Sequence, residues 1–200
     1  MALGTATVPY ELRFGAGRIC LDLLATAHPV ERLDSVDVLC AWITASGLVP
    51  AGTPLGHADA TWPAVFRELR GRVDQLVRGA LRTEAGPRPS YGPELALVND
   101  LARTAPPAPR AVRAQDGTLV RELAGPPELS ALLAAVARDA VELLTDAPTR
   151  AGLRQCEGDN CRIVYLDTSR GRRRRWCSSE VCGNRERVAR HRRRAALSRA

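Results

Sequence analysis

Four cysteines in the last quarter of the chain have a spacing that suits a metal ion. Cys156 and Cys161 form one C-x4-C pair, Cys177 and Cys182 form a second, and fifteen residues separate the pairs. Zinc accepts four thiolates in a tetrahedron at about 2.3 Å each, which leaves no position for a reactive water. The pattern therefore predicts one structural zinc ion. Iron–sulfur clusters also use four cysteines, so the spacing alone leaves that alternative open.

Arginines crowd around these cysteines. Residues 151–200 contain fourteen arginines and five acidic residues, a net charge of +9, so residues 1–150 carry −2 of the chain's +7. Such an asymmetric charge indicates a module that binds a polyanion. All basic residues apart from the histidines are arginine, which can reflect genome composition, but codon usage does not decide where charges cluster. The candidate nucleic-acid contacts are Arg172, Arg173, Arg174, Arg175, Asn184, Arg185, Arg187, Arg190 and Arg194.

Several of these arginines lie on a predicted C-terminal helix, residues 181–197. Three of them, at i, i+3 and i+7 from Arg187, share one face. Val181, Val188 and Ala195 recur every seven residues on another face, which we expect to pack on the metal-binding unit. Helices of this kind can enter the major groove of duplex DNA. Few aromatic residues lie nearby, which argues against binding of single strands by base stacking.

The elements that must position the cysteines can also be predicted. Residues 162–166 indicate a strand, 167–171 a turn, and 172–176 a second strand that returns to the second cysteine pair. With the C-terminal helix, these elements predict a treble-clef-like zinc finger made of a β-hairpin and a helix.

Asn184 and Arg185, at the start of the C-terminal helix, have two interpretations. An amide and a guanidinium at a helix N-terminus can contact bases or phosphates. Alternatively, both are architectural, with Asn184 bonding to backbone near the metal and Arg185 pairing with Asp167 in the predicted turn. The architectural interpretation is the one that we favour.

The first 150 residues predict a mainly α domain. Apolar residues recur at helical spacing in several segments, and Asp116-Gly117 has the composition of a hairpin turn. Alternation around Gly15 and Gly17 indicates a small hairpin, or a strand leading into a helix. The predicted fold is thus a multihelical domain with small β-hairpins over residues 1–150 and a zinc finger over residues 151–200. The predicted helices cover residues 20–24, 36–43, 61–77, 94–104 and 129–144.

Other classes of protein are disfavoured. The sequence contains no Ser/His/Asp arrangement, phosphate-binding glycine loop or paired carboxylates that would indicate an enzyme. No apolar run approaches the ~18 residues of a membrane span, and the N-terminus does not resemble a signal peptide. We therefore expect a cytoplasmic protein, where clustered cysteines bind metal more often than they form disulfides. The lone Cys20 and Cys40 are expected to be buried thiols.

Particular residues carry a family resemblance. The run Cys182-Gly-Asn-Arg185, preceded by Arg174-Arg-Trp-Cys177 and Tyr165-Leu-Asp-Thr-Ser169, resembles the CGNR zinc-finger family. Members pair this finger with an N-terminal helical ABATE domain, whose landmarks are matched by Gly17-Arg-Ile-Cys-Leu-Asp22 and Leu39-Cys-Ala-Trp42. The family commonly has Asn where this chain has Ala25, and Lys-Ala where it has Glu186-Arg187.

The resemblance implies a bacterial, stress-related transcription regulator. On that basis we expect the finger to bind DNA and the N-terminal domain to sense a small-molecule effector or to mediate association. Because a lone finger would give only modest specificity, we also expect a homodimer. The alternative is an interaction module whose finger docks RNA or an acidic protein. We do not expect an enzyme.

Overall fold

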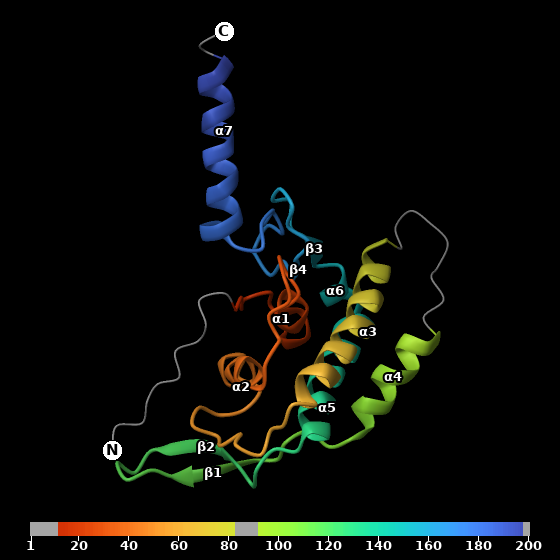
Figure 1. The fold of residues 1–200 in the computed structure, drawn as a ribbon, viewed down its shortest axis with the longest axis vertical. Helices are drawn as coiled ribbons and strands as arrows, with labels where there is room; N and C mark the ends of the chain where they lie inside the picture. Colours follow the sequence, from red (N-terminus) through yellow and green to blue (C-terminus); the bar gives the residue numbers. More distant parts are fainter. Residues whose placement is uncertain (1–11, 83–91, 198–200) are drawn as a thin grey trace.

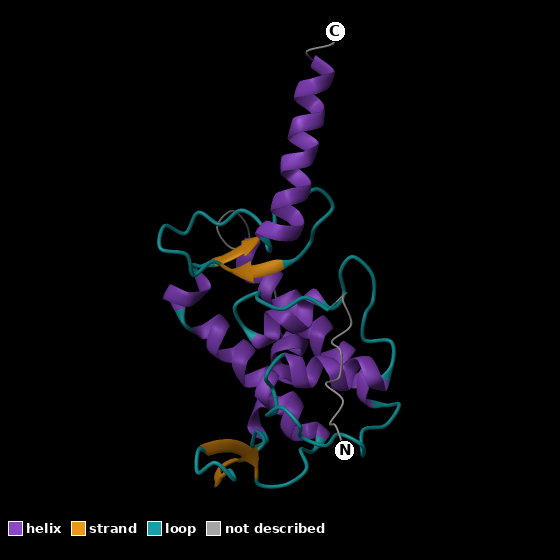
Figure 2. Cartoon of the chain, turned by 90° about the vertical axis from the view of Figure 1, so that its left-hand side faces the viewer, coloured by secondary structure: helices purple, strands orange, loops and turns teal. Residues whose placement is uncertain are grey.

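The computed structural model describes residues 12–82 and 92–197. The helical domain contains α1 to α6 and one hairpin, β1–β2, and the finger adds a second hairpin, β3–β4 (Figures 1 and 2). A short π-helical turn, η1, leads into α7, which projects away from the rest of the molecule (Figure 1). The elements are α1 (Ile19–Ala25), α2 (Val36–Ala45), α3 (Trp62–Arg82), α4 (Gly92–Arg103), β1 (Pro109–Arg113), β2 (Leu119–Leu123), α5 (Leu129–Thr145), α6 (Ala147–Arg150), β3 (Leu153–Gln155), β4 (Val164–Leu166), η1 (Ser179–Gly183) and α7 (Asn184–Leu197).

The predicted helices of the N-terminal domain are confirmed. The apolar stripe of α3 is buried against α1, α4 and α5, and the apolar face of α5 is buried with it. Trp42 of α2 packs its ring edge-on to Phe66 of α3, with 6.0 Å between centroids. Burial of such side chains contributes roughly 1.5–3 kcal/mol each. The central buried positions are Phe66, Leu69, Val73, Leu132, Leu133, Val136 and Leu143.

Local signals fix several boundaries. The Ser35 side chain accepts a hydrogen bond from the backbone N–H of Val38 at 3.3 Å, which caps α2. The Asp116 carboxylate accepts from Thr118, and Gly117 has a φ of +84°, so the predicted β1–β2 hairpin forms. Its loop is longer than the two-residue turn expected from Asp116 and Gly117, because the N–H of Ala114 donates to the carbonyl of Thr118 and Asp116 has no positive φ. The Asp146 side chain accepts from the backbone N–H of Thr149 at 2.8 Å and starts α6, a short helix that the sequence interpretation missed.

The segment that leads into α1 differs from the prediction. Residues 12–18 form no strand, and Arg18 directly precedes α1 in an extended conformation. Tyr10 and Glu11, which began the predicted strand, lie outside the described residues. The backbone of this segment instead lies against the finger.

The finger hairpin also differs from the prediction. β3 pairs antiparallel with β4, with Arg154 opposite Tyr165. Residues 172–176, predicted as the second strand, form none. The hairpin therefore encloses the first cysteine pair, whereas the prediction placed it between the two pairs. The overall class, a mainly α domain followed by a hairpin-and-helix finger, is as predicted.

The finger and the helical domain share one hydrophobic core. Val164, Tyr165 and Leu166 of β4 are buried in the same cluster as the apolar residues of α1. The backbone N–H of Leu166 donates to the carbonyl of Ala16 at 2.7 Å. Gly17 has a φ of +93°, and a Cβ added there would lie 3.0 Å from the Cβ of Leu166. The two units are thus joined by a seam in which only glycine fits at residue 17.

This seam gives a prediction. Gly17→Ala is expected to destabilise the protein by roughly 2–4 kcal/mol, because it adds a steric clash to an unfavourable positive φ. Gly15→Ala is the matched control, since Gly15 has a φ of +92° but open space around its Cβ position. Urea unfolding measures both free energies. Equal destabilisation by the two substitutions would show that the contact with Leu166 does not matter.

Helix α7 has little support from the body of the protein. Among the described elements it packs mainly against η1. Val181 and Val188 are 40% and 43% exposed, so the expected packing of this apolar face on the finger is wrong. No described helix is long and apolar enough to cross a membrane.

Candidate metal centre and its arginine framework

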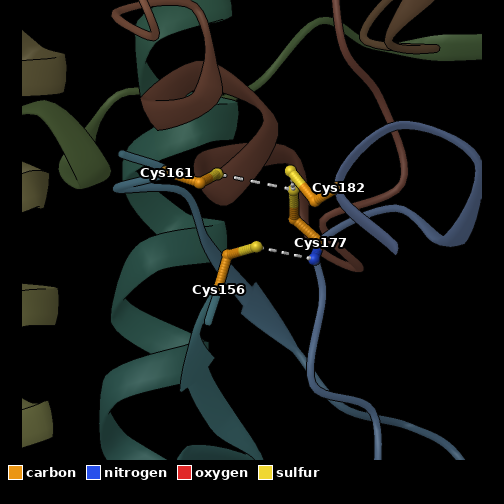
Figure 3. A group of neighbouring side chains, drawn as sticks. All are labelled: Cys156, Cys161, Cys177 and Cys182. Atoms are coloured by element: carbon orange, nitrogen blue, oxygen red, sulfur yellow. Dashed lines mark hydrogen bonds between the residues drawn. The ribbon is translucent and has the colours of Figure 1, made fainter. Parts of the chain in front are cut away.

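The four cysteines come together from three segments. Cys156 and Cys161 lie in the loop between β3 and β4, Cys177 lies in the following loop, and Cys182 lies in η1 (Figure 3). Their sulfurs all lie within 4.8 Å of one another, and the Cys161–Cys177 and Cys177–Cys182 pairs are 3.8 and 3.7 Å apart. Sulfurs at about 2.3 Å from a tetrahedral zinc ion lie about 3.8 Å apart. The cluster therefore has the dimensions of a site for one zinc ion.

The backbone shapes this site. The amides of Gly158 and Cys177 donate to the sulfur of Cys156 at 3.4 and 3.3 Å. A Cβ added at Gly158 would lie 3.1 Å from the Cβ of Cys182 and 3.3 Å from its sulfur. Asn160 has a φ of +58°, and the N–H of Cys161 closes the turn onto the carbonyl of Gly158 at 3.0 Å. The first knuckle is thus a tight turn that brings its backbone close to the second cysteine pair.

Ionisation of the thiols explains why a cation belongs here. A hydrogen bond from the Cys177 thiol lowers the pKa of Cys161 to about 5. That hydrogen bond, burial and the nearby Cys161 thiolate raise the pKa of Cys177, while burial and the same charge raise the pKa of Cys182 to about 11. The negative charge on Cys161 therefore opposes ionisation of Cys177 and Cys182. A divalent ion offsets the repulsion among four thiolates.

Arg174 braces the finger from inside. Its Nε donates to the carbonyl of Trp176 at 2.8 Å, and its terminal nitrogen donates to the carbonyl of Cys177. Its guanidinium lies 4.5 Å from the centroid of the buried Tyr165 ring, and the Tyr165 hydroxyl donates to the Arg174 carbonyl. The half-buried Arg174 is therefore a structural residue that stacks on the Tyr165 ring. The sequence showed Tyr165 only as part of the family motif and did not predict this contact.

Other predicted contacts also have partners within the protein. The Arg187 guanidinium donates to the carbonyls of Gly183 and Ser179, both at 3.3 Å. Arg175 pairs with Glu157 at 2.6 Å, and Arg172 reaches the carbonyl of Pro148 at 3.4 Å. Arg187 thus helps to hold α7 on the metal-binding turn.

The remaining predicted contacts are exposed. Arg173, Asn184, Arg185, Arg190 and Arg194 have no side-chain partner within residues 12–82 and 92–197. Arg192 is exposed in the same way, and Arg193 pairs with Glu186 at 2.8 Å; sequence reasoning had not chosen either arginine. Arg192 and Arg193 are candidates because they lie on the projecting helix α7, and not because of their spacing in the sequence.

The expected pair between Arg185 and Asp167 does not form. Asp167 is 2% exposed, and its carboxylate accepts from the backbone N–H groups of Ser169 and Arg174 at 2.9 and 3.0 Å. Hydrogen bonds from the side chain and backbone of Ser169 lower the pKa of Asp167. Asp167 orders the loop before the second cysteine pair, so the expected pairing of Arg185 is wrong. The expected hydrogen bond from the Asn184 side chain to the backbone near the metal is also absent among the described residues.

The isolated cysteines differ from each other. Cys20 is fully buried as predicted, whereas Cys40 is half-buried. Burial raises the pKa of both thiols. In the described part of the chain, neither belongs to a group of residues that could hold a metal.

Four clustered cysteines, a hairpin that encloses one pair and a helix that follows the other define a zinc finger, here attached to a helical domain. Residues 153–195 match the family model of the CGNR zinc finger. Residues 17–147 match the ABATE family, which is described as "Putative stress-induced transcription regulator". Because this match spans more than half of the chain, the protein belongs to the ABATE family. No curated protein matches the sequence. The resemblance seen in the sequence is confirmed, and the metal is one structural zinc ion.

Proposed function

We propose that this protein is a zinc-dependent, DNA-binding transcription regulator, acting in the bacterial cytoplasm, whose finger docks α7 on duplex DNA. The observation that carries the proposal is the projecting α7, which presents exposed arginines with no partner among the described residues. The role is one of binding rather than catalysis, because four thiolates leave zinc no open position.

The physical state of α7 argues for a polyanionic partner. Its 14 residues include six arginines and one acidic residue. Isolated helices of this length are marginally stable in water, and like charges at i, i+4 weaken them further. Phosphates would relieve this repulsion and release counterions. The zinc site holds η1, which leads directly into α7, so the charges are held away from the body.

The shape of α7 favours DNA. An α-helix with side chains is about 10–12 Å across and fits the roughly 12 Å major groove of B-DNA. The major groove of an A-form RNA helix is too deep and narrow for such readout. An acidic protein surface would satisfy the charge but lacks this fit. The exposed Arg173, in the loop before Cys177, is suited to a neighbouring phosphate.

Salt dependence tests this function. The zinc-loaded protein is titrated into a labelled DNA duplex between about 50 and 200 mM salt, and fluorescence anisotropy gives the affinity. We expect log K to fall linearly with log salt, with a slope of about −0.9 for each phosphate contacted. RNA duplex and an acidic peptide serve as comparisons under the same conditions. No measurable duplex DNA binding at the lowest salt, or tighter binding to either comparison, would contradict the proposal.

A further inference from the structure

We propose that a cavity at the seam between the helical domain and the finger binds a small organic anion that carries a phosphate or carboxylate group and a short apolar part. The cavity has a volume of about 420 Å³, within the range of small-molecule sites. Leu24 and Ala27 of the α1 end give it an apolar wall. Helix α3 forms a second side, and Gln155 and Arg162 of the finger form a third.

Gly71 provides the first argument. It lies in the interior of α3, where glycine is less favourable than alanine. A Cβ added there would meet nothing within 4 Å, so neither packing nor a positive φ requires glycine. Gly71 lines the cavity, and its missing side chain leaves the helix surface bare at that point. A ligand lying against α3 would account for a residue that the folded chain itself does not need.

The charges at the cavity provide the second argument. The Arg70 guanidinium is held by both carboxylate oxygens of Glu31 and by the Thr26 hydroxyl. Asp74 holds Arg78 at 2.8 and 2.9 Å. These two guanidiniums are therefore oriented before any ligand arrives.

Arg162 makes the cavity positive overall. Its side chain is exposed and has no partner among the described residues, while its carbonyl accepts from Arg78 at 3.0 Å. Burial and the charges of Arg78 and Arg162 lower the pKa of His28, which favours a neutral imidazole there. One uncompensated guanidinium beside two fixed ones is suited to a phosphate or carboxylate, which Arg binds through two parallel hydrogen bonds.

The position of the cavity connects the ligand to the zinc site. Gln155 directly precedes Cys156, and Arg162 directly follows Cys161. An anion held between these residues and α3 would fasten the first knuckle to the helical domain. The binding of this anion rests on the cavity alone and does not depend on the proposed DNA-binding function.

Calorimetry of the full zinc-loaded chain tests the site, with phenyl phosphate and benzoate as probes at constant ionic strength and without DNA. We expect the better probe to bind with a Kd of about 1 mM or tighter. Arg162→Ala is expected to weaken it at least about tenfold, and Gly71→Leu, which fills the cavity, to abolish it. Arg121→Ala, on the β1–β2 hairpin, is the matched control and should bind as the wild type does.

Two further readouts make the result decisive. Gly71→Ala should raise the melting temperature of the free protein. Such a rise would show that Gly71 destabilises the protein when no ligand is bound. Zinc content and circular dichroism confirm that each variant is folded. The proposal is overturned if neither probe binds at a concentration about ten times the expected Kd. It is also overturned if the folded Gly71→Leu variant binds the probe as tightly as the wild type does. Because no DNA is present, neither outcome affects the proposed function.

Discussion

Removal of zinc is expected to unfold the knuckles, η1 and α7, while the helical domain stays folded. Structural zinc in small fingers contributes about 10–16 kcal/mol of apparent binding free energy, comparable to the whole stability of a typical domain. The four thiolates are the main link between the segments that carry them, since η1 and α7 pack mainly against each other. Without the ion, no coordination bond joins the sulfurs of these segments.

The shared core limits how far this unfolding extends. Val164, Tyr165 and Leu166 are buried against the helical domain, and Leu166 is hydrogen-bonded to Ala16. We therefore expect β4 to keep part of its protection from hydrogen exchange. Residues 167–197 should lose theirs, so the boundary of unfolding falls inside the finger rather than at its start.

Hydrogen exchange with mass spectrometry, with and without a chelator, measures this boundary. Cys161→Ser should reproduce the effect of the chelator, because serine removes one thiolate. Cys40→Ser is the control, as Cys40 lies outside the cluster. Circular dichroism should report the loss of α7. Retention of the α7 signal and of its slow exchange after zinc removal would show that the metal does not hold this helix.

The zinc ligands and the helices could be predicted from the sequence because both depend on local spacing. Two C-x4-C pairs around a hairpin-sized segment indicate a four-thiolate metal site before any tertiary contact is known. Likewise, α3 and α5 follow from apolar residues at helical intervals. The seam could not be foreseen in this way, since the fit of Gly17 against Leu166 joins residues about 150 positions apart.

The loop before the second cysteine pair shows why the predicted strand failed. The Asp167 carboxylate accepts a hydrogen bond from the backbone N–H of Arg174, and the Ser169 hydroxyl accepts one from the backbone N–H of Arg173. Side chains thus occupy backbone groups that a strand would pair. The short β3, before the first cysteine, supplies the partner for β4 instead. Composition and alternation alone do not reveal that these side chains compete for the backbone N–H groups.

The roles of the arginines could not be separated by sequence either. Arg174 and Arg187 donate to carbonyls of the finger, whereas Arg190 and Arg194 have no partner among the described residues. All four looked equivalent as positive charges. The carbonyls that accept from Arg174 and Arg187 are in position only once the zinc loops are folded. Substitutions at Arg190 and Arg194 can therefore test DNA binding without disturbing the metal site.

Charge reversal on α7 is expected to abolish most of the affinity for duplex DNA. Arg190 and Arg194 lie one turn apart on one face of the helix. Loss of two phosphate contacts should reduce the salt slope by about 1.8, and two added negative charges should lower affinity by at least about 100-fold at low salt. The double variant Arg190→Glu and Arg194→Glu leaves the bracing Arg174 and Arg187 in place.

A second double variant, Arg113→Glu and Arg121→Glu, separates specific contact from net charge. Both arginines are exposed on the β1–β2 hairpin, at the far end of the helical domain from α7 (Figure 2). The two double variants change the net charge equally, so a purely long-range attraction would weaken both alike. Direct docking of α7 predicts a large loss only for the first. Zinc content should be normal in both variants. Equal DNA affinities of the two variants would refute direct contact by α7, because net charge alone would then explain the loss of affinity.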